Sequence, residues 1–229
     1  MSKCLVQRAI AFFTLIILLT CSACGGGGLA KFRVLHAAPD EPQLNVLVNG
    51  NIVSSNLAYT DATGYINVNS GARTFELVPV NSDTPLINTT LNLAASTSST
   101  VIVTGIYPIN TIILVDGAQT PSSGTALIRL VNAAPSMGSA DVYVVPQGSG
   151  LTGATPLAAG LGFQVTSTYE TLNVATGSTG NYQVYFTEPG STLVLATGPL
   201  SVSSGEALTI VSLNGVNGGF TFQSLIDLK

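Results

Sequence analysis

One segment of this chain occurs twice, and the repeat limits the possible folds more than any other feature. Arg33-Val34-Leu35-His36-Ala37-Ala38-Pro39 returns 96 residues later as Arg129-Leu130-Val131-Asn132-Ala133-Ala134-Pro135. The order of later matches is also kept: Asn45–Val48 with Asp141–Val144, Leu57–Tyr59 with Leu161–Phe163, and Phe75–Leu77 with Tyr182–Val184. We therefore expect one structural unit, built twice from the same pattern.

Each copy alternates short β-rich runs with turn residues. In the first copy we expect strands near 32–35, 44–48, 64–68, 74–80, 87–93, 100–105 and 111–115. In the second copy we expect them near 126–131, 141–145, 169–174, 182–187, 193–196, 207–213 and 220–226. About seven short strands per copy predict an all-β fold of two tandem immunoglobulin-like β-sandwich domains.

The domain boundaries follow from the repeat and from the Gly-, Pro- and Ser-rich punctuation. We expect a signal peptide over 1–23, a lipidated cysteine and Gly-rich tether over 24–30, and a linker over 119–124. The two β-sandwich repeats then span 31–118 and 125–229. No cysteine follows Cys24, so the sandwiches must fold without disulfides, and no sulfur-ligated metal site is available.

The N-terminal segment predicts export. Lys3 and Arg8 precede the uncharged apolar run Ala9–Leu19, which is shorter than the roughly 20 residues that a membrane-spanning helix needs. Ser22-Ala23-Cys24 resembles the bacterial lipobox, in which small residues precede a cysteine that is lipidated on its sulfur. Cys21 is the weaker candidate for lipidation. The alternative is ordinary secretory cleavage after Ala23, which leaves Cys24 as a free thiol.

The lipoprotein resemblance implies two or three acyl chains on Cys24, enough for lasting membrane attachment. Gly25–Gly28 would serve as a flexible leash. Gly25, in place of Asp, directly after the cysteine indicates sorting to the outer membrane. We therefore expect an outer-membrane lipoprotein, on the periplasmic face or at the cell surface.

The first repeat resembles a known bacterial family. Arg33–Asp40, followed by Val46–Gly50 and by Gly71–Leu77, is similar to the domain of unknown function 4397 (DUF4397). The resemblance covers nearly all of residues 31–118 and continues more weakly through 125–229. It implies extracytoplasmic β domains, often in tandem and often on lipoproteins, with no established activity. The second repeat departs from the pattern with Asn132 and Ser136 at the positions of His36 and Asp40.

His36 and Asp40 are the first candidates for chemistry or ligand binding, because histidine is the commonest general base and metal ligand. One interpretation makes them a small metal or acid–base site at the Ala-Ala-Pro turn. The other makes His36 a hydrogen-bonding group that closes the first strand, a role that Asn132 can also fill. We favour the structural turn, because the chain holds only this histidine.

No other motif predicts catalysis or a cofactor. Scattered acidic residues (Asp61, Glu76, Asp83 and Glu170) could pair as glycosidase carboxylates, but such residues on β surfaces usually serve solubility. A further group of aromatic residues could form a stacking surface for sugars or peptides: Tyr59, Tyr65, Tyr107, Phe163, Tyr169 and Tyr185. Aromatic residues in sandwiches more often fill cores. We expect no metal and no cofactor.

The charge balance argues against nucleic acid as a partner. Five basic residues follow Ala23 (Lys31, Arg33, Arg73, Arg129 and Lys229), against 11 acidic residues, so the chain offers no basic surface for phosphates.

We therefore predict a non-enzymatic protein that is anchored to the membrane by lipid. Its tandem β-sandwich modules would serve for binding or display in the cell envelope or at the cell surface. Its partner would be a protein or a glycan. The alternatives are a structural spacer or assembly subunit of an envelope complex, and an envelope hydrolase whose site the sequence does not reveal.

Overall fold

The computed structural model describes residues 27–228, which form sixteen strands and no helix. No helix that could cross a membrane therefore occurs in this part of the chain. The strands of the first repeat are β1 (Leu29–Ala37), β2 (Leu44–Val48), β3 (Asn51–Leu57), β4 (Ile66–Asn69), β5 (Gly71–Pro79), β6 (Ile87–Leu93), β7 (Ser98–Thr104) and β8 (Asn110–Asp116). Those of the second are β9 (Thr125–Asn132), β10 (Ala140–Pro146), β11 (Ala158–Leu161), β12 (Thr166–Asn173), β13 (Thr179–Thr187), β14 (Val194–Ser203), β15 (Ala207–Asn214) and β16 (Phe220–Leu228).

Each repeat is a sandwich of two four-stranded sheets. The first repeat has the orders β4-β1-β7-β8 and β3-β2-β5-β6, and the second has the matching orders β12-β9-β15-β16 and β11-β10-β13-β14. The strands pair antiparallel except β1 with β7 and β9 with β15, which are parallel. The predicted all-β sandwich fold is confirmed. Lettered in chain order, the sheets are DAGH and CBEF, whereas a constant immunoglobulin domain has ABED and CFG.

Sequence patterns missed one strand in each repeat, β3 and its counterpart β11. β3 carries Ser54, Ser55 and Asn56 in its middle, and β11 is built from small residues, so neither has the apolar alternation of a strand. The turn before β3 does carry a signal. Asn49 and Gly50 join β2 to β3 with φ angles of 49° and 75°, the conformation that makes Asn-Gly the preferred two-residue hairpin turn.

Strand pairing also corrects one match between the repeats. Phe75 lies opposite Val48, and Val184 lies opposite Val144, so Phe75 corresponds to Val184. The sequence match of Phe75 with Tyr182 is therefore wrong by two residues. Such an error is easy to make, because a shift of two residues leaves every side chain of a strand on its original face.

Each sandwich encloses its own apolar core. In the first repeat Phe32 packs edge-to-face on Phe75, with the ring centroids 6.1 Å apart, and Leu77 lies on the same face. In the second repeat Phe186 packs against Phe222 at 5.9 Å. Thr74, Glu76 and Val78 lie on the other face of β5, so this strand alternates between a buried and a more exposed face.

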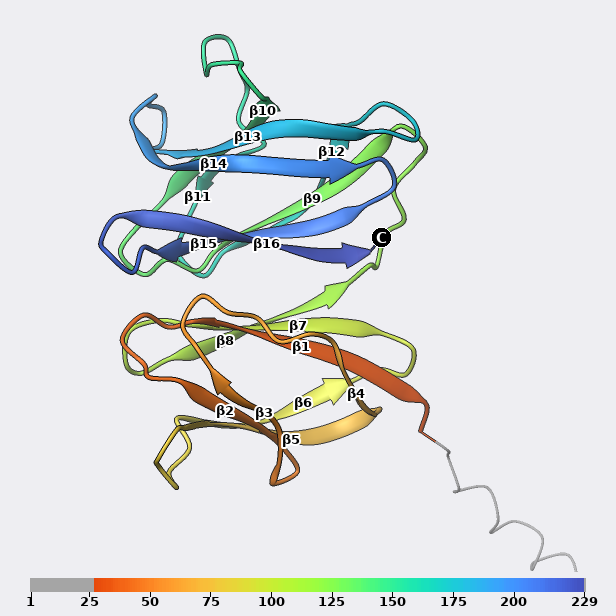
Figure 1. Ribbon diagram of the computed structural model, residues 1–229, viewed down its shortest axis with the longest axis vertical. Coiled ribbons are helices and arrows are strands. Elements are labelled where there is room, and N and C mark those ends of the chain that lie inside the picture. The colour runs from red at the N-terminus through yellow and green to blue at the C-terminus, as the bar shows by residue number, and fades with distance from the viewer. Residues whose placement is uncertain (1–26, 229) are drawn as a thin grey trace, which may run out of the picture.

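The two repeats are packed face to face. Figure 1 shows four sheets in a stack, with the sheet of β1 and β7 against the sheet of β9 and β15. A third apolar cluster fills the layer between them, with the buried members Leu35, Ala37, Ile102, Leu114, Val131, Ala133, Val211, Leu213 and Leu225. The two inner sheets are thus covered on both faces. This explains why β7 and β9 are almost continuously buried instead of alternating.

Ile102 and Ile113 test this layer as a matched pair. Ile102 is fully buried between the repeats, whereas Ile113 on β8 is 50 % exposed. We expect Ile102→Ala to lower the free energy of unfolding by about 2–5 kcal/mol, through lost burial and a residual cavity. Ile113→Ala should change it by less than about 0.5 kcal/mol. Urea unfolding followed by circular dichroism measures both, and equal losses would contradict the described packing.

Candidate functional site

Buried charge gathers in the layer between the repeats. On β1, Phe32 and Val34 point into the core of the first sandwich, so Arg33 points the other way, toward the second repeat. Arg129 takes the same place on β9, between Ile128 and Leu130. Both arginines are nearly inaccessible, with 6 % and 5 % exposure. A buried guanidinium requires hydrogen bonds and a counter-charge, and each arginine finds its counter-charge in the opposite repeat.

Arg33 joins its own sheet to β16 of the second repeat. Its Nε donates to Thr100 Oγ1 at 2.8 Å, and its Nη1 donates to the backbone oxygen of Ile226 at 2.8 Å. Its Nη2 donates to Asp227 Oδ1 at 2.5 Å, in a charge-assisted bond.

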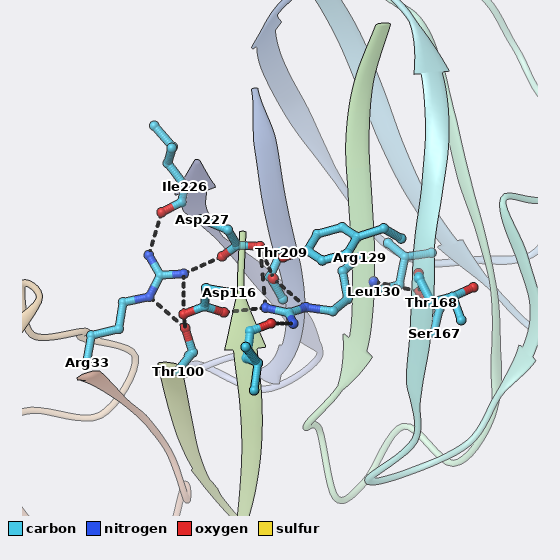
Figure 2. A network of polar contacts seen from close by, with 12 residues as sticks. Arg33, Thr100, Asp116, Arg129, Leu130, Ser167, Thr168, Thr209, Ile226 and Asp227 are labelled. Carbon is cyan, nitrogen blue, oxygen red and sulfur yellow. Dashed lines mark hydrogen bonds and ion pairs between the residues drawn. The ribbon is translucent and has the colours of Figure 1, made fainter. Parts of the chain in front are cut away.

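Arg129 makes the corresponding contacts in the reverse direction. Its Nε donates to Thr209 Oγ1 at 2.9 Å, its Nη1 to the backbone oxygen of Val115 at 2.8 Å, and its Nη2 to Asp116 Oδ1 at 2.5 Å. Figure 2 shows both carboxylates lying between the two guanidinium groups. We call Arg33, Asp116, Arg129 and Asp227 the arginine–aspartate clamp.

Hydroxyl groups complete the shells of the two clamp carboxylates. Asp116 Oδ2 accepts bonds from Thr100 Oγ1 at 2.6 Å and from the Tyr65 hydroxyl at 2.9 Å. Asp227 Oδ2 accepts the matching bonds from Thr209 at 2.6 Å and from Tyr169 at 2.7 Å. Both aspartate side chains are fully buried.

The two tyrosines also cover the arginines. Arg33 Cζ lies 4.7 Å from the centroid of the Tyr65 ring, and Arg129 Cζ lies 4.7 Å from that of Tyr169, within the range of a cation–π contact. Burial, with the nearby aspartate charge, raises the pKa of both phenols far above 10. Tyr65 and Tyr169 therefore stay protonated and act as hydrogen-bond donors.

The clamp is balanced in charge and closed to solvent. Burial raises the pKa of Asp227, an effect opposed by the hydrogen bonds from Thr209 and Tyr169 and by the charge of Arg129. No buried side-chain nitrogen or oxygen among the described residues lacks a hydrogen-bond partner. Two positive and two negative groups thus satisfy one another, and the arrangement holds the two repeats together instead of presenting reactive groups.

His36 is fully buried at the end of β1, and its ring bonds to the backbone of the following turn. Its Nδ1 accepts the N–H of Ala38 at 3.4 Å, and its Nε2 lies 3.0 Å from the oxygen of Pro42. Asp40, predicted alongside it, is exposed. Burial lowers the pKa of His36, although the backbone hydrogen bonds to Pro42 and Glu41 act against this.

Asn132 performs the same task in the second repeat. Its Oδ1 accepts the N–H of Ala134 at 3.1 Å, and its Nδ2 donates to the oxygen of Gly138 at 2.8 Å. A ring in one repeat and an amide in the other therefore bridge the same turn.

The structure does not bring the remaining predicted residues together. Glu76 accepts a bond from Asn88, and Glu170 accepts one from Thr168, both at exposed sites. Within residues 27–228 no three His, Cys, Asp or Glu side chains are grouped as metal ligands would be. Cys24 and the predicted signal peptide lie outside the described residues.

The aromatic residues considered for a stacking surface lie in different parts of the structure. Tyr65 and Tyr169 belong to the clamp, whereas Tyr107 is 73 % exposed on the loop between β7 and β8. Tyr59 donates its hydroxyl to the backbone oxygen of Asn214 across the two repeats at 2.7 Å, and burial raises its pKa to about 12.

The clamp itself escaped prediction, although a signal was present. Arg33 and Arg129 served as landmarks of the repeat, and each stands in an otherwise apolar run. Asp116 and Asp227 occupy matching positions near the ends of β8 and β16, after Leu-Val and Leu-Ile. Charged residues at equivalent positions of apolar strands in both repeats indicate buried ion pairing.

Fold and clamp together define a class of protein in which two eight-stranded β-sandwiches are joined through their inner sheets. Residues 30–143 match the family described as "Domain of unknown function (DUF4397)", so the chain contains a domain of this family, as its sequence motifs indicated. The match extends beyond the first repeat through β9 and into β10.

Comparisons with other proteins add little. No curated protein matches the chain. A family CBM26 module from Eubacterium rectale Amy13K, solved with maltoheptaose, is 11 % identical over 86 % of this chain and 95 % of its own, with a TM-score of 0.29. The glycogen-degrading pneumococcal virulence factor SpuA is 8 % identical over 80 % of this chain, which spans only 21 % of SpuA, and its TM-score is also 0.29. These likenesses are too slight to carry an argument.

The clamp predicts a large effect on stability. Asp227→Ala leaves the buried Arg33 guanidinium without its carboxylate, and we expect a loss of about 3–5 kcal/mol in the free energy of unfolding. Asp116→Ala should cost a similar amount, because the second half of the clamp makes the same contacts. Glu76→Ala, at an exposed pair, is the control and should cost less than about 0.5 kcal/mol. Guanidinium unfolding measures all three, and a clamp variant as stable as the control would refute the role of the clamp.

His36 predicts a pH dependence of stability. Its pKa is lowered in the folded state, so folding favours the neutral ring, and this stabilisation is present above the unfolded pKa of about 6.5. It is lost as the pH falls from there through the lower folded pKa. His36→Asn, which installs the amide used at Asn132, should remove this dependence. Urea midpoints between pH 7.5 and 5 measure the difference between the two proteins, and parallel curves would contradict the prediction.

Proposed function

We propose that this protein is a non-enzymatic, lipid-anchored binding module that displays two fused β-sandwiches as one rigid block in the cell envelope. The observation that carries the proposal is the arginine–aspartate clamp. It uses four buried charged groups to join the inner sheets, and it thereby leaves the two outer sheets on opposite surfaces of the block.

A rigid block suits a binding function. The clamp, together with the apolar layer of Leu35, Ile102, Val131 and Val211, opposes hinge motion between the repeats. Surface groups on either repeat then keep fixed positions before a partner arrives, which lowers the entropic cost of association.

The proposed anchor would hold the block close to the membrane. The oxygen of Gly28 already accepts the N–H of Ser70, and β1 begins at Leu29, two residues before the expected start of the first repeat. Only four residue steps separate Cys24 from Gly28, so an extended chain spans at most roughly 14 Å. The end of the first sandwich that carries the turn at Ser70 would face the lipid, on the periplasmic face of the outer membrane or at the cell surface.

A structural spacer is the second candidate, and the same stiffness favours it. Four stacked sheets fix the separation between any two components attached to the outer faces. The two functions differ in what they require: a spacer needs the clamp and the two-repeat length, whereas a binding module also needs particular surface groups.

The anchor is tested by cell fractionation and mass spectrometry of the full-length protein. We expect acyl chains on Cys24 and recovery in the outer-membrane fraction. Cys24→Ser should abolish acylation and membrane retention, whereas Cys21→Ser, three residues away, should leave both unchanged. An unmodified Cys24 in membrane-free material would refute the anchored display.

The proposed binding to an envelope partner is tested by mixing the full-length protein in detergent with isolated envelope material. A binding module should co-sediment saturably with an envelope fraction. Glu76→Ala should leave this association unchanged, whereas unfolding of the protein should abolish it. Failure to associate with any envelope fraction, with the clamp intact, would favour the spacer.

A further inference from the structure

Two tyrosines stand side by side on the outer sheet of the second repeat. Tyr143 on β10 lies directly opposite Tyr185 on β13. Their neighbours Val142, Val184 and Phe186 fill the core of the sandwich, so both tyrosines point to the outer face. Both are partly exposed. Side chains directly opposite on antiparallel strands have Cβ atoms about 4.5–5.5 Å apart, so the two tyrosines are direct neighbours on this face.

Neutral hydrogen-bonding groups flank this tyrosine pair on the same face. Gln183 donates from Nε2 to Thr197 Oγ1 at 2.7 Å, and Ser201 donates from Oγ to Asn181 Oδ1 at 2.9 Å. Each amide keeps a further donor or acceptor for a ligand.

The strands of this sheet contain one charged residue, and it is fully engaged. Asp141 is 6 % exposed, and its carboxylate accepts the backbone N–H groups of Gly160 at 2.7 Å and of Gly190 at 2.8 Å. The groups that the outer face leaves available to a ligand are therefore aromatic, amide and hydroxyl groups, none of which is charged.

The first repeat lacks this surface at the equivalent positions. Leu47 on β2 lies opposite Glu76 on β5, where the second repeat has Tyr143 opposite Tyr185. The tyrosine pair is thus not a requirement of the fold, since the same sandwich forms without it.

We propose that the Tyr143–Tyr185 surface binds a neutral carbohydrate, an inference that rests on the binding function proposed above and names its ligand class. The apolar C–H faces of sugar rings would lie on the two tyrosine rings, while Gln183 and Asn181 hydrogen-bond to sugar hydroxyls. Two adjacent rings suit a chain of successive sugar units better than a single monosaccharide.

Other ligand classes fit this surface poorly. Nucleic acids and acidic glycans need cationic groups, which the strands of this sheet do not contain. A peptide with apolar anchor residues needs pockets. The two tyrosines instead stand on the outer face of a sheet, beside polar side chains.

The test uses the full-length protein in a polyoxyethylene detergent, which has no sugar headgroup. Maltohexaose, cellohexaose, xylohexaose and mannohexaose serve as neutral probes, and polygalacturonate as the acidic probe. Because the chain has no tryptophan, its intrinsic fluorescence reports tyrosine directly, and isothermal calorimetry gives the affinity. We expect at least one neutral oligosaccharide to bind with a micromolar to millimolar Kd, and polygalacturonate not to bind.

Matched variants locate the site. Tyr143→Ala and Tyr185→Ala should each weaken binding by about tenfold or more, whereas Tyr143→Phe, which keeps the ring, should weaken it less than about threefold. Leu47→Ala, at the equivalent position of the first repeat, and Tyr107→Ala, at an exposed loop, should leave the affinity unchanged. Tyr185→Glu copies the residue that the first repeat tolerates there, and it tests the site even where an alanine variant fails to fold.

Several outcomes would overturn this inference. The first is the absence of binding to every neutral probe. The second is sugar binding that does not change when Tyr143 or Tyr185 is substituted. The third is a protein partner without any sugar that occupies this face. If envelope association persists while sugar binding fails, the carbohydrate inference falls and the binding function stands. If sugars bind a protein that is not acylated at Cys24, the anchored display falls and the carbohydrate site stands.

Discussion

The structure depends on two arginines and two aspartates that neutralise one another in the layer between the repeats. Removing these groups from water is costly, and their attraction compensates only where geometry and hydrogen bonding are complete. Both conditions are met here, since each guanidinium reaches a carboxylate at 2.5 Å and each carboxylate accepts a threonine and a tyrosine hydroxyl. The closest ion pairs cross between the repeats, because Arg33 takes its nearest carboxylate from the second repeat and Arg129 from the first. The clamp therefore specifies one arrangement of the two sandwiches, while the surrounding apolar layer supplies most of the stabilisation.

The face-to-face packing of the repeats changes which side chains the inner strands can carry. A sandwich strand normally alternates between a buried and a solvated face, but β1, β7, β9 and β15 are covered on both sides. Polar residues on them must consequently find partners within the layer. Thr104 donates to the oxygen of Ala133 in the other repeat at 2.7 Å, whereas Thr100 and Thr209 each donate to the clamp carboxylate of their own repeat. Two separate sandwiches on a leash would need none of these contacts, so the face-to-face fusion accounts for the buried polar residues of the inner sheets.

The sequence was sufficient for the all-β class and for most strands, because short apolar runs and turn residues are local signals. It was insufficient for β3 and β11, whose stability comes from pairing with a neighbour and not from their own pattern. The clamp was missed for a different reason: charged residues in apolar strands indicate burial, but Arg33 and Asp227 are 194 residues apart, and neither strand indicates that the repeats face each other. Tyr65 and Tyr169 were grouped with surface aromatics for the same reason. Only the packing of the two inner sheets turns them into partners of arginine.

The two repeats agree at the clamp and differ on their outer sheets. At the clamp each arginine, aspartate, threonine and tyrosine has an identical counterpart, because a change on one side would leave a buried charge on the other side unpaired. At the turn that follows β1 and β9 only the hydrogen bonds must be kept, and His36 and Asn132 both supply them. On the outer sheets no such reciprocity applies, and Leu47 and Glu76 stand where the second repeat has two tyrosines. Since the fold does not demand that difference, the outer sheet of the second repeat is where a function particular to this chain is most directly sought.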